Sequence, residues 1–193
     1  MAKVNYGKLV LGKWSTKTLV AVAIGAALFG VLMAYGSIPI FTNTQLTSAM
    51  IVPVVVGGLF GPLPAFVTLL LGNILADTIG GWGYWFDWSI GNGVLGFFIG
   101  TLPLYGARID EGVFKARHAV IYTIIAILGN AAAFGLVTPL LTSWFYAADV
   151  EITFLQAFAS GVSNTVVLVV AGIPILVLLS RRFGKRKDLK EED

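Results

Sequence analysis

The sequence predicts an all-α integral membrane protein with six transmembrane helices, and three observations carry this prediction. The 193-residue chain is 57% hydrophobic and only 12% charged, whereas soluble domains carry about 25% charged residues. Several apolar stretches approach or exceed the roughly 17–25 residues that cross a bilayer. The 13 Lys and Arg residues are confined to three segments. Together these observations predict a single membrane domain over residues 1–193, with short basic tails at 1–17 and 181–193.

The six helices are predicted from apolar runs that end at Gly, Pro or polar residues. They cover residues 18–35, 45–59, 64–76, 89–105, 119–141 and 154–180. The second and third form a hairpin, because Pro62 and Pro64 in the turn GLFGPLP remove backbone donors and disfavour helix in the preceding residues. We expect the sixth helix to kink at Pro174. The hairpin would bring the polar segments on either side of it to one face of the membrane.

The charge distribution predicts the orientation of the chain. The basic residues lie in the N-terminal tail, in the loop between the fourth and fifth helices, and in the C-terminal tail. With six crossings these segments share one side, and Lys and Arg favour the cytoplasm, so both termini are predicted to be cytoplasmic. The opposite loops carry only Asp77, Asp87, Asp149 and Glu151. The basic excess therefore indicates topology and contact with anionic lipid, and not nucleic-acid binding.

The sequence lacks the motifs of catalysis and metal binding. It has no cysteine, no GxxxxGK[ST] phosphate loop, no HExxH pair and no nucleophile–base combination. Its one histidine, His118, is expected to be solvated in a charged loop. We therefore predict no enzyme activity, no metal and no cofactor. Asp77 remains open, because a carboxylate inside the bilayer is costly and usually functional, whereas one at the headgroup level is wet and structural.

Amides at helix depth and one aromatic loop predict a small-molecule site at the outer face. The amides are in or at the ends of the last four helices, where such groups bond another helix or a ligand: Asn73, Asn92, Asn130 and Asn164. The loop after Gly80 contains five rings within seven positions: Trp82, Tyr84, Trp85, Phe86 and Trp88. Interfacial anchoring explains any single ring, but their density favours stacking on a flat heterocycle. We predict an outward pocket for a planar molecule with polar edges.

Small residues on the first helix predict a contact surface. Ala23 and Ala27 stand four positions apart, flanked by Ala21, Gly25, Ala26 and Gly30. This spacing lets another helix approach closely. Packing inside the bundle explains the similar pairs at 57/61 and 96/100, whereas the first helix is a candidate for docking an external partner.

These features together resemble the S-component of an energy-coupling factor (ECF) transporter, a vitamin-binding membrane subunit, and more specifically the riboflavin-type family. The resemblance covers nearly the whole chain. The matching pieces are GAALFGVLMAYGSIPI (25–40), Asn43 and Gln45, FGPLPAF (60–66), GNILAD (72–77), GYWFDWSIGNGVLGFFIG (83–100), DEGVF (110–114), GNAAAFGLVTP (129–139) and SGVSNT (160–165). The pattern departs at Asn73 and Ala76, where many relatives are expected to have histidine and lysine, so the ligand would be recognised differently here.

The resemblance implies a multi-pass protein of a prokaryotic cell membrane that captures a vitamin for import. The partners it implies are a transmembrane T-component and two cytoplasmic ATPases, which would hydrolyse the ATP. Docking to the T-component is carried over to Ala23 and Ala27. Substrate binding is carried over to Asn43, Gln45, Asp77, Trp85, Trp88, Asn92, Asn130 and Asn164. Riboflavin is the first expectation, with cobalamin or a thiamine precursor as alternatives.

A different class of protein also fits part of the sequence. A self-sufficient carrier or channel would use a proton gradient, with Asp77 as the titrating group. Such carriers usually show internal repeats and ionisable residues at the midplane, and this sequence shows no clear repeat. A structural protein is the third alternative, but it leaves the aromatic loop and the amides unexplained.

Overall fold

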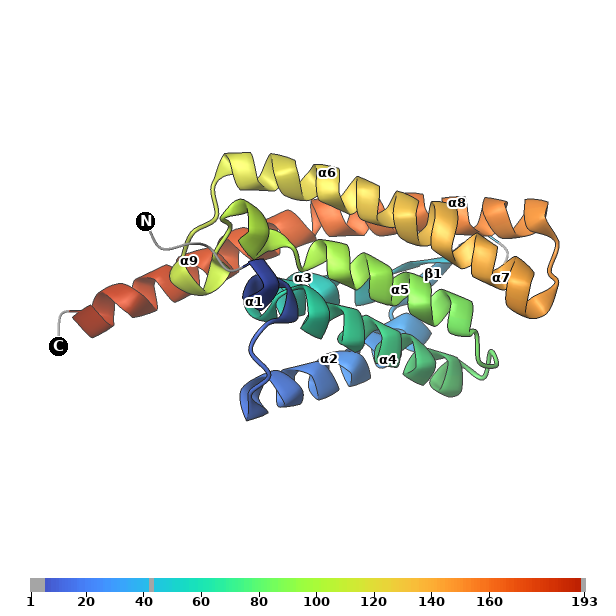
Figure 1. Ribbon diagram of the computed structural model, residues 1–193, viewed down its shortest axis with the longest axis horizontal. Helices are drawn as coiled ribbons and strands as arrows, with labels where there is room; N and C mark the ends of the chain where they lie inside the picture. The colour runs from blue at the N-terminus through green and yellow to red at the C-terminus, as the bar shows by residue number, and fades with distance from the viewer. Residues whose placement is uncertain (1–5, 42–43, 192–193) are drawn as a thin grey trace.

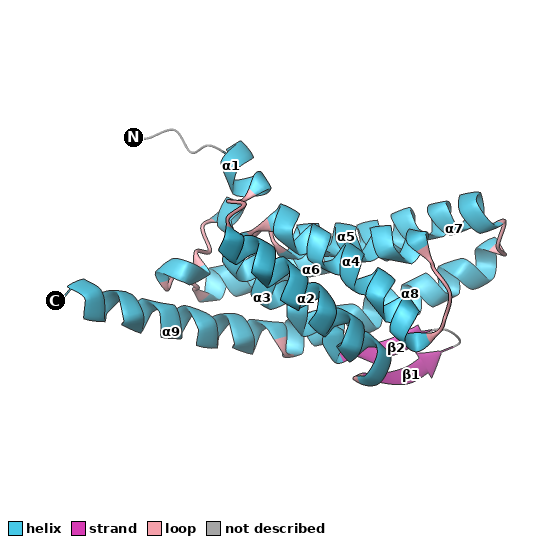
Figure 2. Ribbon diagram, turned by 90° about the horizontal axis from the view of Figure 1, so that it is seen from below, coloured by secondary structure: helices cyan, strands magenta, loops and turns pink. Residues whose placement is uncertain are grey.

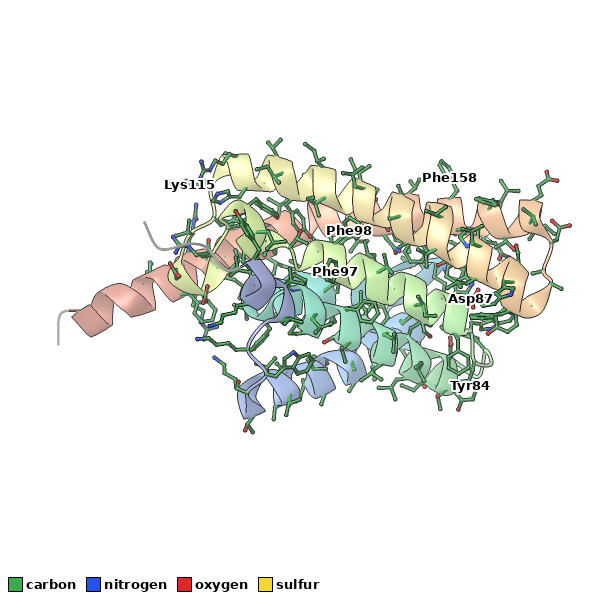
Figure 3. The ribbon with its side chains drawn as sticks, viewed as in Figure 1. Tyr84, Asp87, Phe97, Phe98, Lys115 and Phe158 are labelled. Atoms are coloured by element: carbon green, nitrogen blue, oxygen red, sulfur yellow. The ribbon has the colours of Figure 1, made fainter. Side chains whose placement is uncertain are left out.

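The computed structural model describes residues 6–41 and 44–191, which form an elongated bundle of helices (Figure 1). The short helix α1 (Tyr6–Leu11) and the C-terminal part of α9 (Gly172–Glu191) lie toward one end of the long axis. Helix α7 (Thr138–Tyr146) lies at the other end. The basic residue Lys115 is at the first end, and Tyr84 and Asp87 are at the second (Figure 3).

Four helical stretches are long and apolar enough to cross a membrane: Thr16–Tyr35, Pro62–Gly80, Ala116–Tyr146 and Val150–Lys185. The predicted second and fourth spans correspond to shorter helices, α3 (Ile51–Phe60) and α5 (Phe86–Ile99). The 14 residues of α5 measure about 21 Å at 1.5 Å per residue, less than the roughly 30 Å hydrocarbon core. The structure therefore confirms a mostly helical chain with four helical stretches suited to crossing a membrane, and the six crossings stay a prediction.

The break between α3 and α4 (Pro62–Gly80) lies inside the predicted turn. Gly61 has a φ of 91°, a conformation that favours glycine. Pro62 occupies the first position of α4, where its missing N–H costs no helical hydrogen bond. Helix α4 continues four residues beyond the predicted end, so Asp77 lies in its last turn and not in a loop.

Residues 45–47, predicted to begin the second helix, instead form a strand. A two-stranded antiparallel hairpin joins β1 (Ser37–Phe41) to β2 (Thr44–Thr47), with Ser37 opposite Thr47 and Pro39 opposite Gln45. Isoleucine and threonine favour extended backbone, and Pro39 is tolerated because its strand is at an edge. The hairpin lies beside α8 (Figure 2). A short 3₁₀ turn, η1 (Ser48–Met50), then leads into α3.

Prolines interrupt the two C-terminal helical stretches without ending them. Between α6 (Ala116–Ala132) and α7 lies the π-helical segment η4 (Ala133–Val137), where Thr138 N donates to Ala133 O. This wider turn precedes Pro139, which has no N–H to donate. Helix α8 (Val150–Val170) is separated from α9 only at Ala171, close to the kink predicted at Pro174, because that proline has no N–H to bond the Val170 carbonyl four residues earlier.

The prediction of a solvated His118 is wrong. The residue is fully buried at the third position of α6, and its ring centroid lies 6.3 Å from that of Tyr105 and 6.1 Å from that of Phe114. Its Nδ1 accepts a hydrogen bond from Lys115 N at 3.1 Å. The histidine therefore satisfies a free backbone donor at the start of the helix, which its position in a charged stretch of sequence concealed.

Helix α2 (Thr16–Tyr35) has both buried and exposed small residues. Gly25 and Gly30 are buried against α4, where a Cβ would lie 2.9 Å from Thr68 Cγ2 and from Leu75 Cβ, respectively. Ala23 and Ala27, in contrast, are exposed. The glycines therefore pack inside the bundle, while the two alanines remain available to an external helix.

Candidate functional site

A cavity of about 490 Å³ lies at the end of the bundle opposite Lys115. Its walls come from β2, α4, α5, α7 and α8 and from the loop that follows α4. Asp77 and Asp149 line the cavity, Asp87 lies at the same end of the bundle (Figure 3), and Glu151 is in the first turn of α8, close to Asp149. We call this the acidic end. The volume falls within the ~300–1,000 Å³ of small-molecule sites.

Six of the eight residues carried over as a substrate site line this one cavity: Gln45, Asp77, Trp85, Trp88, Asn92 and Asn164. They come from separate parts of the chain and meet only in the fold. Asn43 lies outside the described residues. Asn130 lines a separate groove of about 440 Å³ between α6 and α8, and its Nδ2 donates to Ala126 O at 2.9 Å. These positions do not test the binding roles, and the separate groove sets Asn130 apart from the six residues of the cavity.

Hydrogen bonds between α4 and α5 fix one wall of the cavity. Asn92 Nδ2 lies 3.0 Å from both Trp88 O and Asn73 Oδ1. Asn73 Nδ2 in turn donates to Ser89 Oγ at 3.1 Å and lies 3.5 Å from Asp77 Oδ2. Asn73, Asp77, Ser89 and Asn92 are all at least nine-tenths buried. The amides therefore join the two helices, as the sequence suggested, and also face the cavity.

Asp77 positions the aromatic loop. Its Oδ2 accepts a hydrogen bond from Trp85 N at 3.0 Å, and its side chain is only 6% exposed. The carboxylate is therefore shielded from solvent and has a structural role in holding the loop, and a role in ligand binding stays a prediction. Gly81, with a φ of 67°, ends α4 and turns the chain. Through this turn the indoles of Trp82 and Trp85 reach the cavity.

Residues of α7 also contact the aromatic loop that follows α4. The Tyr146 hydroxyl accepts from Phe86 N at 3.2 Å and lies 3.3 Å from Tyr84 O. The rings of Tyr146 and Trp85 meet edge to face with centroids 4.9 Å apart. Asp87, at the start of α5, is fully buried and bonds Thr142 of α7. Sequence reasoning missed Tyr146 and Thr142, because nothing local pairs them with a loop about sixty positions earlier.

Helix α8 supplies a wall that the sequence could have revealed. Thr153, Gln156, Ser160 and Asn164 line the cavity at spacings of three and four residues, which places them on one helical face. The hairpin docks beside them, with Ser163 Oγ 3.4 Å from Gln45 O. Of these residues only Asn164 was predicted, so a polar stripe at helical spacing was the missed signal.

The two departures from the family pattern have different surroundings. Asn73 lines the cavity. Ala76 is fully buried and its backbone N lies against the position where Gly30 would carry a Cβ. Only the first departure therefore bears directly on the cavity wall.

Comparison with known proteins finds one family and several relatives that match most of this chain. Residues 13–181 match the family described as ECF-type riboflavin transporter, S component. A UPF0397 protein of Aliivibrio salmonicida (strain LFI1238) is 36% identical, with 92% of this chain and 97% of that protein covered. A UPF0397 protein of Clostridium perfringens (strain SM101 / Type A) is 32% identical, with 93% and 97% covered.

A crystal structure of FolT bound with folic acid shares the fold. The two structures superpose with a TM-score of 0.55 over 89% of this chain and 95% of that one, at 16% sequence identity. At this identity the likeness concerns the fold alone. The family match over most of the chain and the curated relatives decide the classification: the chain belongs to the family of ECF-type riboflavin transporter S components.

Proposed function

We propose that this chain captures a water-soluble vitamin, or its precursor, in the cavity at the acidic end and presents it for ATP-driven import. The observation that carries the proposal is the meeting of Gln45, Asp77, Trp85, Trp88, Asn92 and Asn164 around one cavity. Indole faces cover the apolar surface of a flat ring, and amide groups bond its polar edge. This arrangement suits binding and release of an unchanged molecule.

The proposed partners are a transmembrane T-component and two cytoplasmic ATPases. The exposed Ala23 and Ala27 on α2 are the proposed contact with the T-component. Leu19, Ile24, Leu28 and Val31 on the same helix are also exposed and apolar, which suits a surface facing lipid or another membrane helix. Riboflavin, which the family description names, is one candidate ligand, and cobalamin and thiamine precursors are the others.

We also propose six crossings with both termini in the cytoplasm. Single cysteines at Lys8, Lys115 and Lys185 should react with a membrane-impermeant thiol reagent only when the reagent has access to the cytoplasmic face of the membrane. Cysteines at Gly83 and Glu151 should react from outside in intact cells. The chain has no cysteine of its own, so only the introduced cysteine can react with the reagent. Labelling of positions 8 and 185 from opposite sides would contradict an even number of crossings.

The function is tested by uptake in proteoliposomes. Vitamin uptake should require the T-component, both ATPases and ATP, and an imposed proton gradient should not replace them. The alternative, a self-sufficient carrier with Asp77 as the titrating group, predicts gradient-driven uptake by this chain alone. That result would refute the proposed dependence on partners. Mass spectrometry of compounds that co-purify with the chain would identify the ligand for this assay.

A further inference from the structure

We propose that the cavity selects an aromatic cation that carries amino or N–H donors, and discriminates against anions. This inference rests on the proposed function, since it names the chemical class of the captured molecule. Three features carry it: the fixed direction of the Asn92 amide, the sign of the charges around the cavity, and the indole rings at the cavity surface.

The direction of the Asn92 side chain is fixed by a backbone atom. Trp88 O can only accept, so the atom of Asn92 that lies 3.0 Å from it must be the amide nitrogen. The same nitrogen faces Asn73 Oδ1, which leaves Asn73 Nδ2 to donate to Ser89 Oγ and toward Asp77. All these hydrogen bonds therefore agree on which atom of Asn92 and of Asn73 is the amide nitrogen.

This direction leaves an acceptor without a donor. Asn92 is 1% exposed and lines the cavity, and its Oδ1 has no hydrogen-bond partner among the described residues. Gln45 Oε1, also on the cavity, is likewise buried and unpartnered within the described chain. A buried polar atom without a partner is costly. A ligand N–H or amino group would remove that cost, whereas a ligand carbonyl would add a second unpaired acceptor.

The hydroxyl groups on the opposite side do not offset this pattern. Thr142 Oγ1 is 2.8 Å from Thr138 O, and Thr153 Oγ1 is 2.7 Å from Asp149 O. Each hydroxyl has a single hydrogen, and a helix carbonyl is available to both. Among the lining amides and hydroxyls that these hydrogen bonds orient, the group left unpaired is therefore an acceptor, the Oδ1 of Asn92.

The charged side chains among the described lining residues of the cavity are all acidic. Asp77 and Asp149 line it, and none of the described lining residues is lysine, arginine or histidine. An anion in this site would meet two carboxylates and no compensating cation. The indoles of Trp82, Trp85 and Trp88 also line the cavity, and the face of an indole attracts a positive charge. Carboxylates and indoles thus favour the same charge on a ligand.

The inference is tested with four probes by quenching of tryptophan fluorescence and by calorimetry. Thiamine is an aromatic cation with an amino group. In oxythiamine a carbonyl replaces that amino group and the remaining donor is the adjacent ring N–H, while the cationic ring is kept. Riboflavin is neutral, and folic acid carries two carboxylates. Thiamine should saturate one site, and oxythiamine should bind about tenfold or more weakly. Riboflavin should bind more weakly than thiamine, and folic acid should give no saturable signal.

A charge-neutralising variant and a matched control localise the effect. Asp77→Asn keeps an oxygen for Trp85 N but removes the charge, so thiamine affinity should fall about tenfold or more. Glu151→Gln removes the same charge from an exposed residue that does not line the cavity, and should leave affinity unchanged. Thermal unfolding and size-exclusion profiles would verify that both variants fold.

Each contrary result separates this inference from the proposed function. Tighter binding of riboflavin or folic acid than of thiamine would overturn the selection for cations while leaving vitamin capture intact. Equal thiamine affinity in Asp77→Asn and Glu151→Gln would also overturn it, as would oxythiamine binding as tightly as thiamine. If none of the probes binds and no vitamin is taken up with the T-component and ATPases present, the proposed function fails together with it.

Discussion

Replacing both Ala23 and Ala27 with leucine should abolish transport and co-purification with the T-component. Both residues are exposed on α2, so leucine there adds bulk where a partner helix would need close approach. Vitamin binding by the isolated chain should survive, because neither residue lines the cavity. Pull-down with a tagged T-component measures assembly, and uptake in proteoliposomes measures transport. A binding titration measures the vitamin affinity of the isolated chain.

A matched control variant keeps small side chains at these two positions of α2. The double variant Ala23→Ser and Ala27→Ser adds one oxygen per residue and should assemble and transport close to wild type. Loss of binding together with assembly in the leucine variant would identify α2 as an internal packing helix. Full assembly of the leucine variant would place the T-component contact on another face of the protein.

Substitutions at the cavity should weaken binding without unfolding the chain. Asn92→Ala removes an amide whose Oδ1 would accept from the ligand, at a cost of roughly 1–3 kcal/mol, so affinity should fall by about tenfold or more. Trp85→Ala or Trp88→Ala removes a stacking ring worth about 0.5–1.5 kcal/mol beyond its buried area. Tryptophan fluorescence titrations with the co-purified vitamin measure each dissociation constant, and thermal unfolding measures each stability.

Asn130→Ala supplies the comparison within the same chain. Asn130 is as buried as Asn92 but lines the separate α6–α8 groove. If the cavity at the acidic end is the binding site, this variant should retain affinity even where it loses stability. Unchanged affinity in the Asn92 and tryptophan variants, with a loss in Asn130→Ala, would move the site to the groove. Lower stability alone in Trp85→Ala and Trp88→Ala would identify those rings as interface anchors.

The helical architecture was predictable because its signals are local. Apolar runs mark the helices, and the break at Gly61–Pro62 follows from a positive φ and a missing N–H. The hairpin at 37–47 was not predicted. Its strands are only five and four residues long, and the second merges in sequence with the apolar run of α3. Packing of β2 against α8 stabilises the strand, and that contact spans more than a hundred positions.

Much of the cavity was predictable for the same reason. Asp77, Trp85, Trp88 and Asn92 lie within sixteen positions, so two neighbouring helices and one loop bring them together. The contributions of α7 and α8 depend on how distant helices pack, and residues such as Thr142 and Tyr146 look like ordinary helix residues in the sequence. Asn130 shows the opposite case, since an amide at the expected depth faces a different groove.

Native mass spectrometry of the detergent-purified chain tests the central claim, capture of one vitamin in the cavity at the acidic end, most directly. The wild-type protein should carry one bound molecule of vitamin mass, and Asn130→Ala should retain it. Asn92→Ala, folded to the same extent, should lose most of that occupancy. A wild-type protein that carries no small molecule after exposure to vitamins, or an Asn92→Ala variant that is fully occupied, would contradict the account.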